Sequence, residues 1–288
     1  MAIDFEPIYS FEELCDICRN ADFTEARKSG LHMDRYRTEF CADLIGKEFP
    51  CSFDDGTRLT FRFPDLHTLE WSENGGEWHE EYYEALLSSG GNVIGMHFFR
   101  RHVLPFEGAF VVFDMDTGFV TWVSIKIGAT FDEKFACSFP HFGEIEGFGT
   151  HEGERHHFSN DLVGTSIDWE YNEDFSIRHA YVSPTLTISP HLPSKNYDEN
   201  DEGFIGRRFL PAFNAKIRDK LLLTSFTEPG NCSAVLLIDL KNVHDIGCFY
   251  GLTHEGTLSS ETITAHGGIG GDGLKIDEGY AHPIVAAE

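Results

Sequence analysis

An internal repeat restricts the fold of this chain more than any other feature of the sequence. The segment LIGKEFPCSFDDGTRLTF begins at Leu44, and the segment LVGTSIDWEYNEDFSIRH begins at Leu162. Each has two apolar residues and a glycine, then alternating residues, then an acidic turn. Later in the chain, FVVFDMDTGFVTWVSI (110–125) is similar to AVLLIDLKNVHDIGCFYG (234–251) in the same order. This repeat predicts two similar domains rather than one large sheet, unless two unrelated series of hairpins merely look alike.

Most of the chain consists of short alternating runs separated by turns, which is the pattern of β-strands. TRLTFRF places Leu59, Phe61 and Phe63 on one side of a strand. GAFVVFDMDTGFVTWVSIKIG contains two strands around an Asp-Thr-Gly turn, which is typical of a hairpin. The sequence therefore predicts a mainly β chain built of two tandem antiparallel barrels, with polar residues facing outward.

Helical patterns are few. Ser10 and Glu13 form a capping box that predicts a helix from there to Gly30, and EEYYEALLS (80–88) predicts a second, shorter helix. We expect a helical extension over residues 1–40, a first barrel over 41–150, and a second barrel with a C-terminal tail over 151–288. The join between the barrels is expected in FGTHEGERHHFSND (148–161).

The charge and the cysteines restrict the partners and the location. The formal net charge of −26 argues against nucleic acids and anionic membranes, which attract basic proteins. We find no apolar run near the length that spans a bilayer, and the acidic start MAIDFEPIYSFEELCD does not look like a signal peptide. Seven cysteines at scattered spacing indicate reduced thiols, so we expect a cytoplasmic protein without membrane partners.

An ordered set of motifs in the second half carries a family resemblance. It consists of LVGTSIDWEYNEDF, then GRRF (206–209), then SFTEP (225–229) and an apolar hairpin. This set resembles the phenolic acid decarboxylases, which are small lipocalin-like barrels that dimerise and use no cofactor. The two-barrel chain is similar over about residues 40–252 to the molybdenum cofactor biosynthesis protein F family. The resemblance implies two lipocalin-like (calycin) barrels and no cofactor, and it makes a homodimer a possible assembly of this chain.

The resemblance also implies a site in the second barrel. Glu228 falls on the family's catalytic glutamate, Arg207 on its arginine, and Tyr171 on the second tyrosine of its pair. Trp169 stands where the first tyrosine belongs, and an indole can donate a hydrogen bond but cannot accept one. Arg208 stands where the family has a tryptophan. The substrate and the reaction are therefore left open.

A closed barrel of about eight strands leaves an interior that fits one small ligand. Side chains at alternate positions should line it: Phe175, Ile177, Tyr181, Phe226, Leu236 and Phe249. We expect Trp169, Tyr181, Phe226 and Arg208 to contact the substrate. A carboxylate in this wall would have a raised pKa and could act as a general acid or base. A structural ion pair between Arg207 and Glu228 is the competing interpretation.

The first barrel departs further from the family pattern. Cys51 and Phe53 occupy the two tyrosine positions. Glu77 aligns with the arginine and Arg100 with the glutamate, so the charges are exchanged between the halves. Glu77, Arg100 and the nearby His97 are the candidate residues of a first-barrel site, although this barrel could instead serve only as a built-in dimer partner.

Three other motifs carry little weight. Cys15-x-x-Cys18 has no second pair, and HEGERHH (151–157) lacks the second histidine of a zinc motif. GIGGDG (268–273) has no strand–helix–strand context for a dinucleotide. We expect no metal site and no cofactor.

The sequence leads to one main hypothesis and two alternatives. The main hypothesis is a cofactor-independent lyase or isomerase that transfers protons on a small aromatic or conjugated carboxylic acid inside a barrel. The first alternative is a calycin protein that binds a small molecule without catalysis, because fold does not fix function. The second is an accessory role in molybdenum cofactor synthesis, which only the resemblance suggests.

Overall fold

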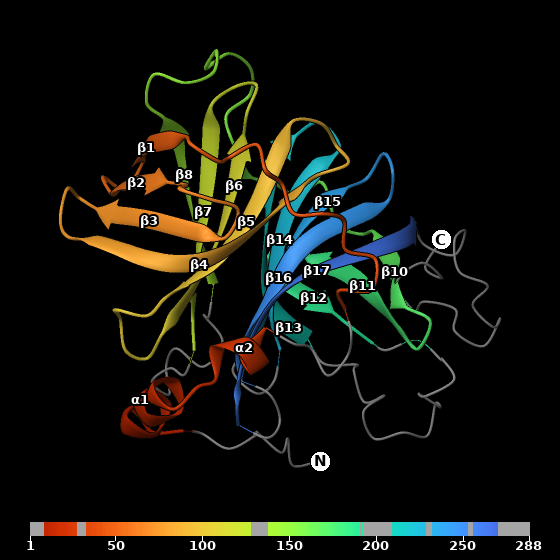
Figure 1. Ribbon diagram of the computed structural model, residues 1–288. Helices are drawn as coiled ribbons and strands as arrows, with labels where there is room; N and C mark the ends of the chain where they lie inside the picture. Colours follow the sequence, from red (N-terminus) through yellow and green to blue (C-terminus); the bar gives the residue numbers. More distant parts are fainter. Residues whose placement is uncertain are drawn as a thin grey trace.

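The structure is a computed structural model that describes residues 9–27, 33–127, 138–190, 192, 209–228, 232–252 and 256–269 (Figure 1). It confirms a mainly β chain with two closed eight-stranded antiparallel barrels in tandem and a short helical segment near the N-terminus. In the part of the chain that is described, no helix is long and apolar enough to cross a membrane.

Within the described residues of the N-terminal segment, 9–27 and 33–40, the helices are α1 (Phe11–Arg19) and α2 (Phe23–Ala26). The predicted capping box is confirmed, because Ser10 Oγ accepts from the Glu13 N–H and the Glu13 carboxylate accepts from the Ser10 N–H. The prediction of one continuous helix is wrong. Asp22 caps a new helix by accepting hydrogen bonds from two backbone N–H groups of α2, so the chain turns after α1.

The first barrel closes through eight consecutive strands, each antiparallel to the next, with β8 paired back to β1. The strands are β1 (Glu48–Phe53), β2 (Arg58–Arg62), β3 (Thr68–Glu73), β4 (Trp78–Leu87), β5 (Val93–Arg100), β6 (Glu107–Asp114), β7 (Phe119–Lys126) and β8 (Ser138–Ile145). The predicted hairpin corresponds to β6 and β7. Each strand therefore has a hydrogen-bonded neighbour on both sides, and this barrel has no edge strand.

The predicted helix at 80–88 is wrong, because this segment belongs to β4. Its residues are good helix formers, but Tyr83 and Ala85 alternate into the barrel core and pair with Phe98 and Met96 of β5. Pairing on both sides of the strand outweighs a helix propensity of a few tenths of a kcal/mol per residue.

The second barrel repeats this arrangement and closes where β12 pairs with β13. Its strands are β10 (Ser166–Asn172), β11 (Phe175–Ser183), β12 (Leu186–Ile188), β13 (Phe209–Arg218), β14 (Leu221–Glu228), β15 (Cys232–Asp239), β16 (His244–Leu252) and β17 (Leu258–Ile269). A short strand between the barrels, β9 (His157–Phe158), adds to the edge of β13.

The repeat is confirmed at the level of single hydrogen bonds. Gly46 and Gly164 both have positive φ, at 76° and 83°, where glycine is strongly preferred. The Gly46 N–H donates to the Phe63 carbonyl at 2.8 Å, and the Gly164 N–H donates to the Tyr181 carbonyl at 2.8 Å. The same turn therefore opens both barrels, which supports an internal duplication.

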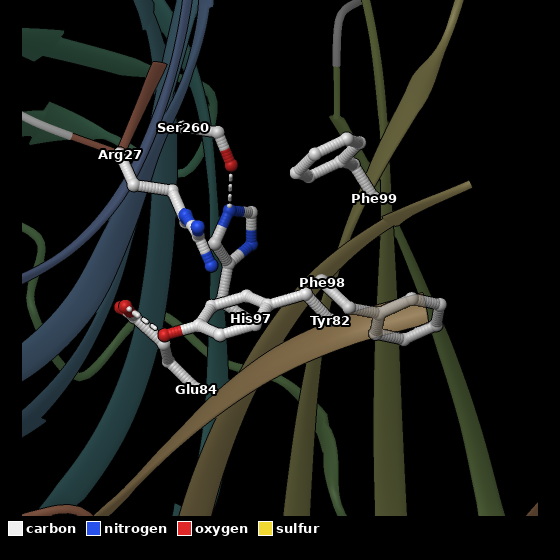
Figure 2. A pocket seen from close by; sticks show the side chains of 7 residues that line it. All are labelled: Arg27, Tyr82, Glu84, His97, Phe98, Phe99 and Ser260. Carbon is white, nitrogen blue, oxygen red and sulfur yellow. Dashed lines mark hydrogen bonds between the residues drawn. The ribbon is translucent and has the colours of Figure 1, made fainter. Parts of the chain in front are cut away.

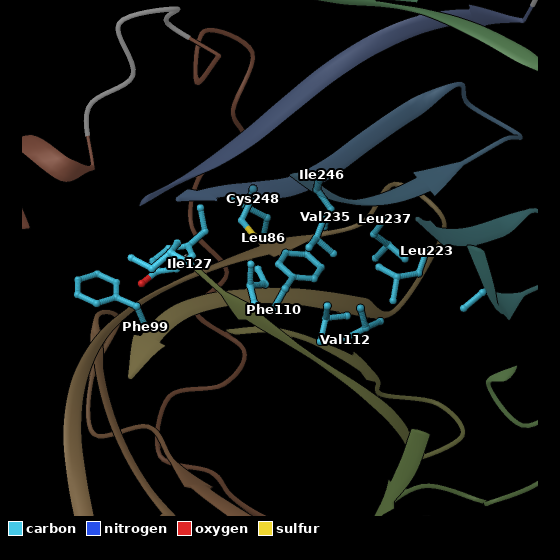
Figure 3. Close-up of a cluster of buried hydrophobic side chains, with 14 of the residues drawn as sticks. Leu86, Phe99, Phe110, Val112, Ile127, Leu223, Val235, Leu237, Ile246 and Cys248 are labelled. Atoms are coloured by element: carbon cyan, nitrogen blue, oxygen red, sulfur yellow. The ribbon is translucent and has the colours of Figure 1, made fainter. Parts of the chain in front are cut away.

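The described residues form three apolar cores. One fills each barrel, and the third lies between the barrels, where the outer faces of β5 to β7 meet the outer faces of β13 to β16 (Figure 3). In Figure 3 the labelled contributions from the first barrel are Leu86, Phe99, Phe110, Val112 and Ile127, and those from the second are Leu223, Val235, Leu237, Ile246 and Cys248. The expectation of polar outer faces is therefore wrong for these strands, because the partner barrel covers them.

A buried ion pair also joins the barrels. Arg218 at the end of β13 donates through Nε to Asp114 Oδ2 at 2.6 Å, and its Nη2 donates to the other oxygen of the same carboxylate. The Asp114 side chain is 1% exposed. Its carboxylate is thus compensated by a bidentate partner from the other barrel, which fixes the contact between them.

Candidate functional site

A tyrosine and a carboxyl group form a hydrogen-bonded pair inside the second barrel. Tyr171 comes from β10, and Asp245 is the second residue of β16. The Tyr171 hydroxyl donates to Asp245 Oδ2 at 3.3 Å, and the Ala265 N–H of β17 donates to Asp245 Oδ1 at 2.7 Å. Both side chains are buried, and Asp245 is 0% exposed. A carboxyl group is thus held in the barrel interior by two donors.

The environment of Asp245 keeps this carboxyl group protonated at neutral pH. Burial raises the pKa of Asp245 to about 8, although the hydrogen bonds from Ala265 and Tyr171 favour the charged form. Desolvation outweighs these two bonds. At pH 7 the Asp245 carboxyl group can therefore donate its proton. Because its pKa lies near this pH, the carboxylate is reprotonated at little cost in free energy.

The two barrels differ at the same interior positions. Val120 and Asp245 are both second residues of their strands, β7 and β16, and Met96 and Thr224 are both fourth residues, of β5 and β14. Ala85 is the strand partner of Met96, and Asn214 is the strand partner of Thr224, so Ala85 and Asn214 are equivalent. Phe61 and His179 are equivalent as well, because each lies two residues before the residue whose carbonyl bonds the first glycine, Phe63 or Tyr181. The second barrel thus has Asp245, Thr224, Asn214 and His179 where the first has Val120, Met96, Ala85 and Phe61.

These polar residues are not needed for packing, because the first barrel fills the same positions with apolar side chains. All four residues in the second barrel are at most 3% exposed. The Thr224 hydroxyl donates to Asn214 Oδ1 at 2.8 Å, and the Asn214 amide donates to the Pro184 carbonyl at 3.3 Å. Buried polar groups need hydrogen-bond partners to offset the cost of desolvation, whereas apolar side chains at these positions need none. Their concentration in one barrel makes its interior the candidate site.

The structure brings several sequence-predicted residues into this interior. Tyr171, Trp169, Tyr181 and Phe226 all belong to its core, and burial raises the pKa of Tyr181. The predicted wall positions are confirmed, with five of them in the core and the sixth, Phe249, packed against it. Figure 1 shows the strands that carry them around one barrel.

The other predicted residues of the second barrel are not placed. Glu228 ends β14 and pairs through its backbone with Cys232 of β15. The side chain of Glu228 lies outside the described part of the structure, as do Arg207 and Arg208. Their roles in catalysis and binding stay predictions.

Sequence reasoning missed Asp245. It follows the turn residues LKNVH, so it looks like one more polar turn residue. The signal was in the repeat, because alignment of the two hairpins puts Asp245 opposite Val120, in the middle of an apolar run. Glu261 was missed as well. It is 2% exposed and follows the same alternation along β17 as the interior residues Ile263 and Ala265.

Among the described residues, no hydrogen bond or ion pair joins the three candidates of the first barrel. Glu77 is exposed in the turn before β4. Arg100 is the last residue of β5, as Glu228 is of β14, but it pairs with Glu73 and Glu107. Arg100 thus holds the strand position that Glu228 holds in the second barrel, while Glu77 is not among the described partners of Arg100. The predicted exchange of the charge pair between the barrels stays a prediction.

His97 lies on the outer face of the first barrel and contacts the second (Figure 2). Its Nδ1 lies 2.9 Å from the Ala109 carbonyl, so Nδ1 carries the proton and Nε2 accepts from the Ser260 hydroxyl at 2.8 Å. Burial lowers the pKa of His97 to about 4, which keeps the ring neutral. A cavity of about 10 Å³ beside it, which Arg27 and Tyr82 also line, has room for one water molecule at most. His97 thus connects the barrels.

The remaining motifs lie at least partly within the described residues. Among the described residues, no three His, Cys, Asp or Glu side chains cluster as metal ligands would. Cys15 and Cys18 are buried free thiols, and Cys18 Sγ accepts from the Phe106 N–H at 3.2 Å. His151 of HEGERHH bonds the Ile145 carbonyl at 3.0 Å. The glycine-rich motif at 268–273 begins in β17, and residues 270–273 lie outside the described part.

Comparison with known proteins adds no assignment. The sequence matches no family model, and it matches no curated protein. The resemblance to the phenolic acid decarboxylases and to the two-barrel family therefore stays a prediction that rests on the motifs themselves.

Proposed function

We propose that the second barrel is the active site of a cofactor-independent lyase or isomerase that acts on a small aromatic or conjugated carboxylic acid. The observation that carries this proposal is the Tyr171–Asp245 pair. It holds a buried carboxyl group with a pKa of about 8 at a position where the first barrel has an apolar residue, Val120. Shifted pKa values of this size are typical of acid–base catalysts.

The chemistry needs one proton transfer to carbon. In a decarboxylation, the protonated Asp245 delivers its proton to the double-bond carbon next to the substrate carboxylate, and the π electrons form the new C–H bond. The conjugated ring carries the resulting electron deficiency. The bond to the carboxylate then breaks, its electrons restore the double bond, and carbon dioxide leaves. Solvent returns a proton to Asp245. An isomerisation uses the same first step and then removes a proton from another carbon.

Each residue has a distinct role in this proposal. Asp245 is the proton donor, and Tyr171 holds its carboxyl group in place. Trp169 and Phe226 shape the apolar wall around the substrate ring. The resemblance adds Glu228 as a second acid or base and Arg207 as the anchor of the substrate carboxylate. We place this activity in the cytoplasm, which suits the free, buried cysteines of the described residues.

The test is solvent isotope incorporation. Metal-free protein is incubated in deuterated water with a panel of hydroxycinnamates and related enoic acids, and the products are analysed by NMR and mass spectrometry. We expect deuterium on a product carbon. Because general acid–base catalysis contributes about 100-fold or more, Asp245→Asn should lower the turnover rate by at least that factor. Tyr171→Phe should lower it less.

Asp219→Asn is the matched control, because Asp219 is exposed in the turn between β13 and β14 and should leave turnover unchanged. Glu228→Gln tests the residue that the resemblance suggests. If turnover survives Asp245→Asn but not Glu228→Gln, Asp245 is not the proton donor. If ligands bind tightly and no deuterium reaches carbon, the barrel only binds its ligand and the enzyme proposal fails.

A further inference from the structure

Arg100 lies at one end of the first barrel among aromatic rings and two carboxylates. Its side chain is 9% exposed. The guanidinium carbon lies 4.8 Å from the centre of the Trp71 ring and 5.6 Å from that of Trp122. Its Nη2 donates to Glu73 at 2.6 Å, and its Nη1 donates to Glu107 at 3.1 Å. The charge is thus compensated, but only one oxygen of each carboxylate is used.

The side of this guanidinium that best fits a carboxylate is only half occupied. A carboxylate can bind an arginine through Nε and Nη2 together, and two other arginines in the described chain do this. Arg178 binds Asp168 with both atoms, and Arg218 binds Asp114 in the same way. Arg100 uses Nη2 on Glu73, while its buried Nε has no acceptor among the described residues.

Two further donors lie in the same cluster. The indole N–H groups of Trp71 and Trp122 are buried, and neither has an acceptor within the described part of the chain. The Trp71 and Trp122 side chains are 1% and 5% exposed. A buried donor without an acceptor costs about 1–3 kcal/mol. The cluster thus holds three such donors, one guanidinium and two indoles, which together favour a ligand that supplies oxygen acceptors.

The rim of this barrel end carries flat rings. The ring centre of His102 lies 5.0 Å from that of Trp71 and 3.9 Å from that of His79, on which it stacks. The His141 ring stacks on Trp122, with 4.6 Å between the ring centres. His79 and His141 are partly exposed and His102 is exposed, so solvent reaches the rim. Aromatic rings bind other aromatic rings by stacking and edge contacts. The ligand that fits both the donors and the rings is flat and carries an acid group.

We propose that this end of the first barrel is a binding site for a small aromatic carboxylate, separate from the active site proposed in the second barrel. The ligand carboxylate bonds Nε and Nη2 of Arg100 in place of Glu73, whose side chain is 38% exposed and can turn into solvent. Glu107 remains on Nη1. The indole N–H groups of Trp71 and Trp122 donate to the ligand oxygens, and its ring lies among the rim histidines.

The four tryptophans of the chain provide the measurement. Protein labelled with ¹⁵N at the indole nitrogens is titrated with cinnamate, and with cinnamamide as the uncharged probe. The indole signals are assigned with single Trp→Phe variants. We expect the Trp71 and Trp122 signals to shift with cinnamate, because their N–H groups gain an acceptor. Cinnamamide should bind at least about 10-fold more weakly, since it lacks the charge that the guanidinium recognises.

Two conservative variants test the role of the guanidinium. Arg100→Lys keeps the charge but removes the paired donors, so the affinity for cinnamate should fall at least about 10-fold. Glu73→Gln removes the competing carboxylate and should tighten binding about 3-fold or more. Glu70→Gln, on the same strand, is the matched control and should change nothing. The indole spectrum of each variant without ligand reports whether the barrel is intact.

Trp169 separates this proposal from the one for the second barrel. Shifts confined to Trp169, equal affinities of wild type and Arg100→Lys, or no shift of Trp71 and Trp122 at millimolar cinnamate would each overturn the first-barrel site. A response of Trp71 and Trp122 without deuterium incorporation would support this site and refute catalysis.

Discussion

Asp245→Asn is expected to make the protein more stable, not less, at neutral and alkaline pH. The folded pKa of Asp245 is raised to about 8, whereas the unfolded carboxyl group ionises near its usual value of 3.8. Between these values the unfolded chain releases a proton that the folded chain keeps, so the free energy of unfolding falls as the pH rises. Over about four pH units the loss is of the order of 5 kcal/mol.

The asparagine variant should lose this dependence. It keeps a buried polar group that can accept from Ala265 but cannot ionise. We expect wild type and variant to be alike near pH 4, and the variant to be more stable by several kcal/mol near pH 8. Urea unfolding followed at a series of pH values measures both curves. Asp219→Asn should leave the wild-type slope unchanged. Parallel curves for wild type and Asp245→Asn would contradict a raised pKa at this position.

The reciprocal change, Val120→Asp, should strongly destabilise the first barrel. Val120 is 0% exposed and lies among apolar residues, and Phe53 stands where the second barrel has Tyr171. The new carboxyl group would have no hydroxyl donor. We expect a loss of about 4 kcal/mol or more in the free energy of unfolding near pH 8, and a smaller loss near pH 5, where the group is protonated.

A double variant tests the equivalence of the two barrels. Adding Phe53→Tyr to Val120→Asp restores the donor that Tyr171 provides and should recover about 1–2 kcal/mol. Phe53→Tyr alone should not stabilise the protein. Thermal or urea unfolding of the four proteins completes the cycle. If Val120→Asp costs less than about 1 kcal/mol at every pH, the two interiors do not differ as described.

The sequence predicted the two barrels because their defining signals are local and occur twice. Gly46 and Gly164 are needed at positive φ, and the alternating runs after them report which side chains face inward. The segment 80–88 was misjudged for the opposite reason. Its composition favours a helix, and only its pairing with β5, which depends on distant residues, makes it a strand.

The site was predictable only in part for the same physical reason. Trp169 and Tyr171 alternate along one strand, so their inward direction could be derived from the pattern. The partner of Tyr171 could not, because Asp245 comes from a strand that is 74 positions away and is brought close by the barrel closing. The alignment of the two halves placed Arg100 opposite Glu228, and these are the last residues of β5 and β14. The ion pairs of Arg100 with Glu73 and Glu107 could not be derived, because they depend on the register of neighbouring strands.

The most direct test of the central claim is the titration of Asp245 itself. Carboxyl carbons of aspartate labelled with ¹³C are followed by NMR across the pH range, in wild type and in Asp245→Asn. We predict one aspartate signal that titrates near pH 8 and is missing from the variant. If every aspartate titrates below about pH 5, or if the high signal persists in Asp245→Asn, the second barrel does not hold a protonated Asp245 at neutral pH.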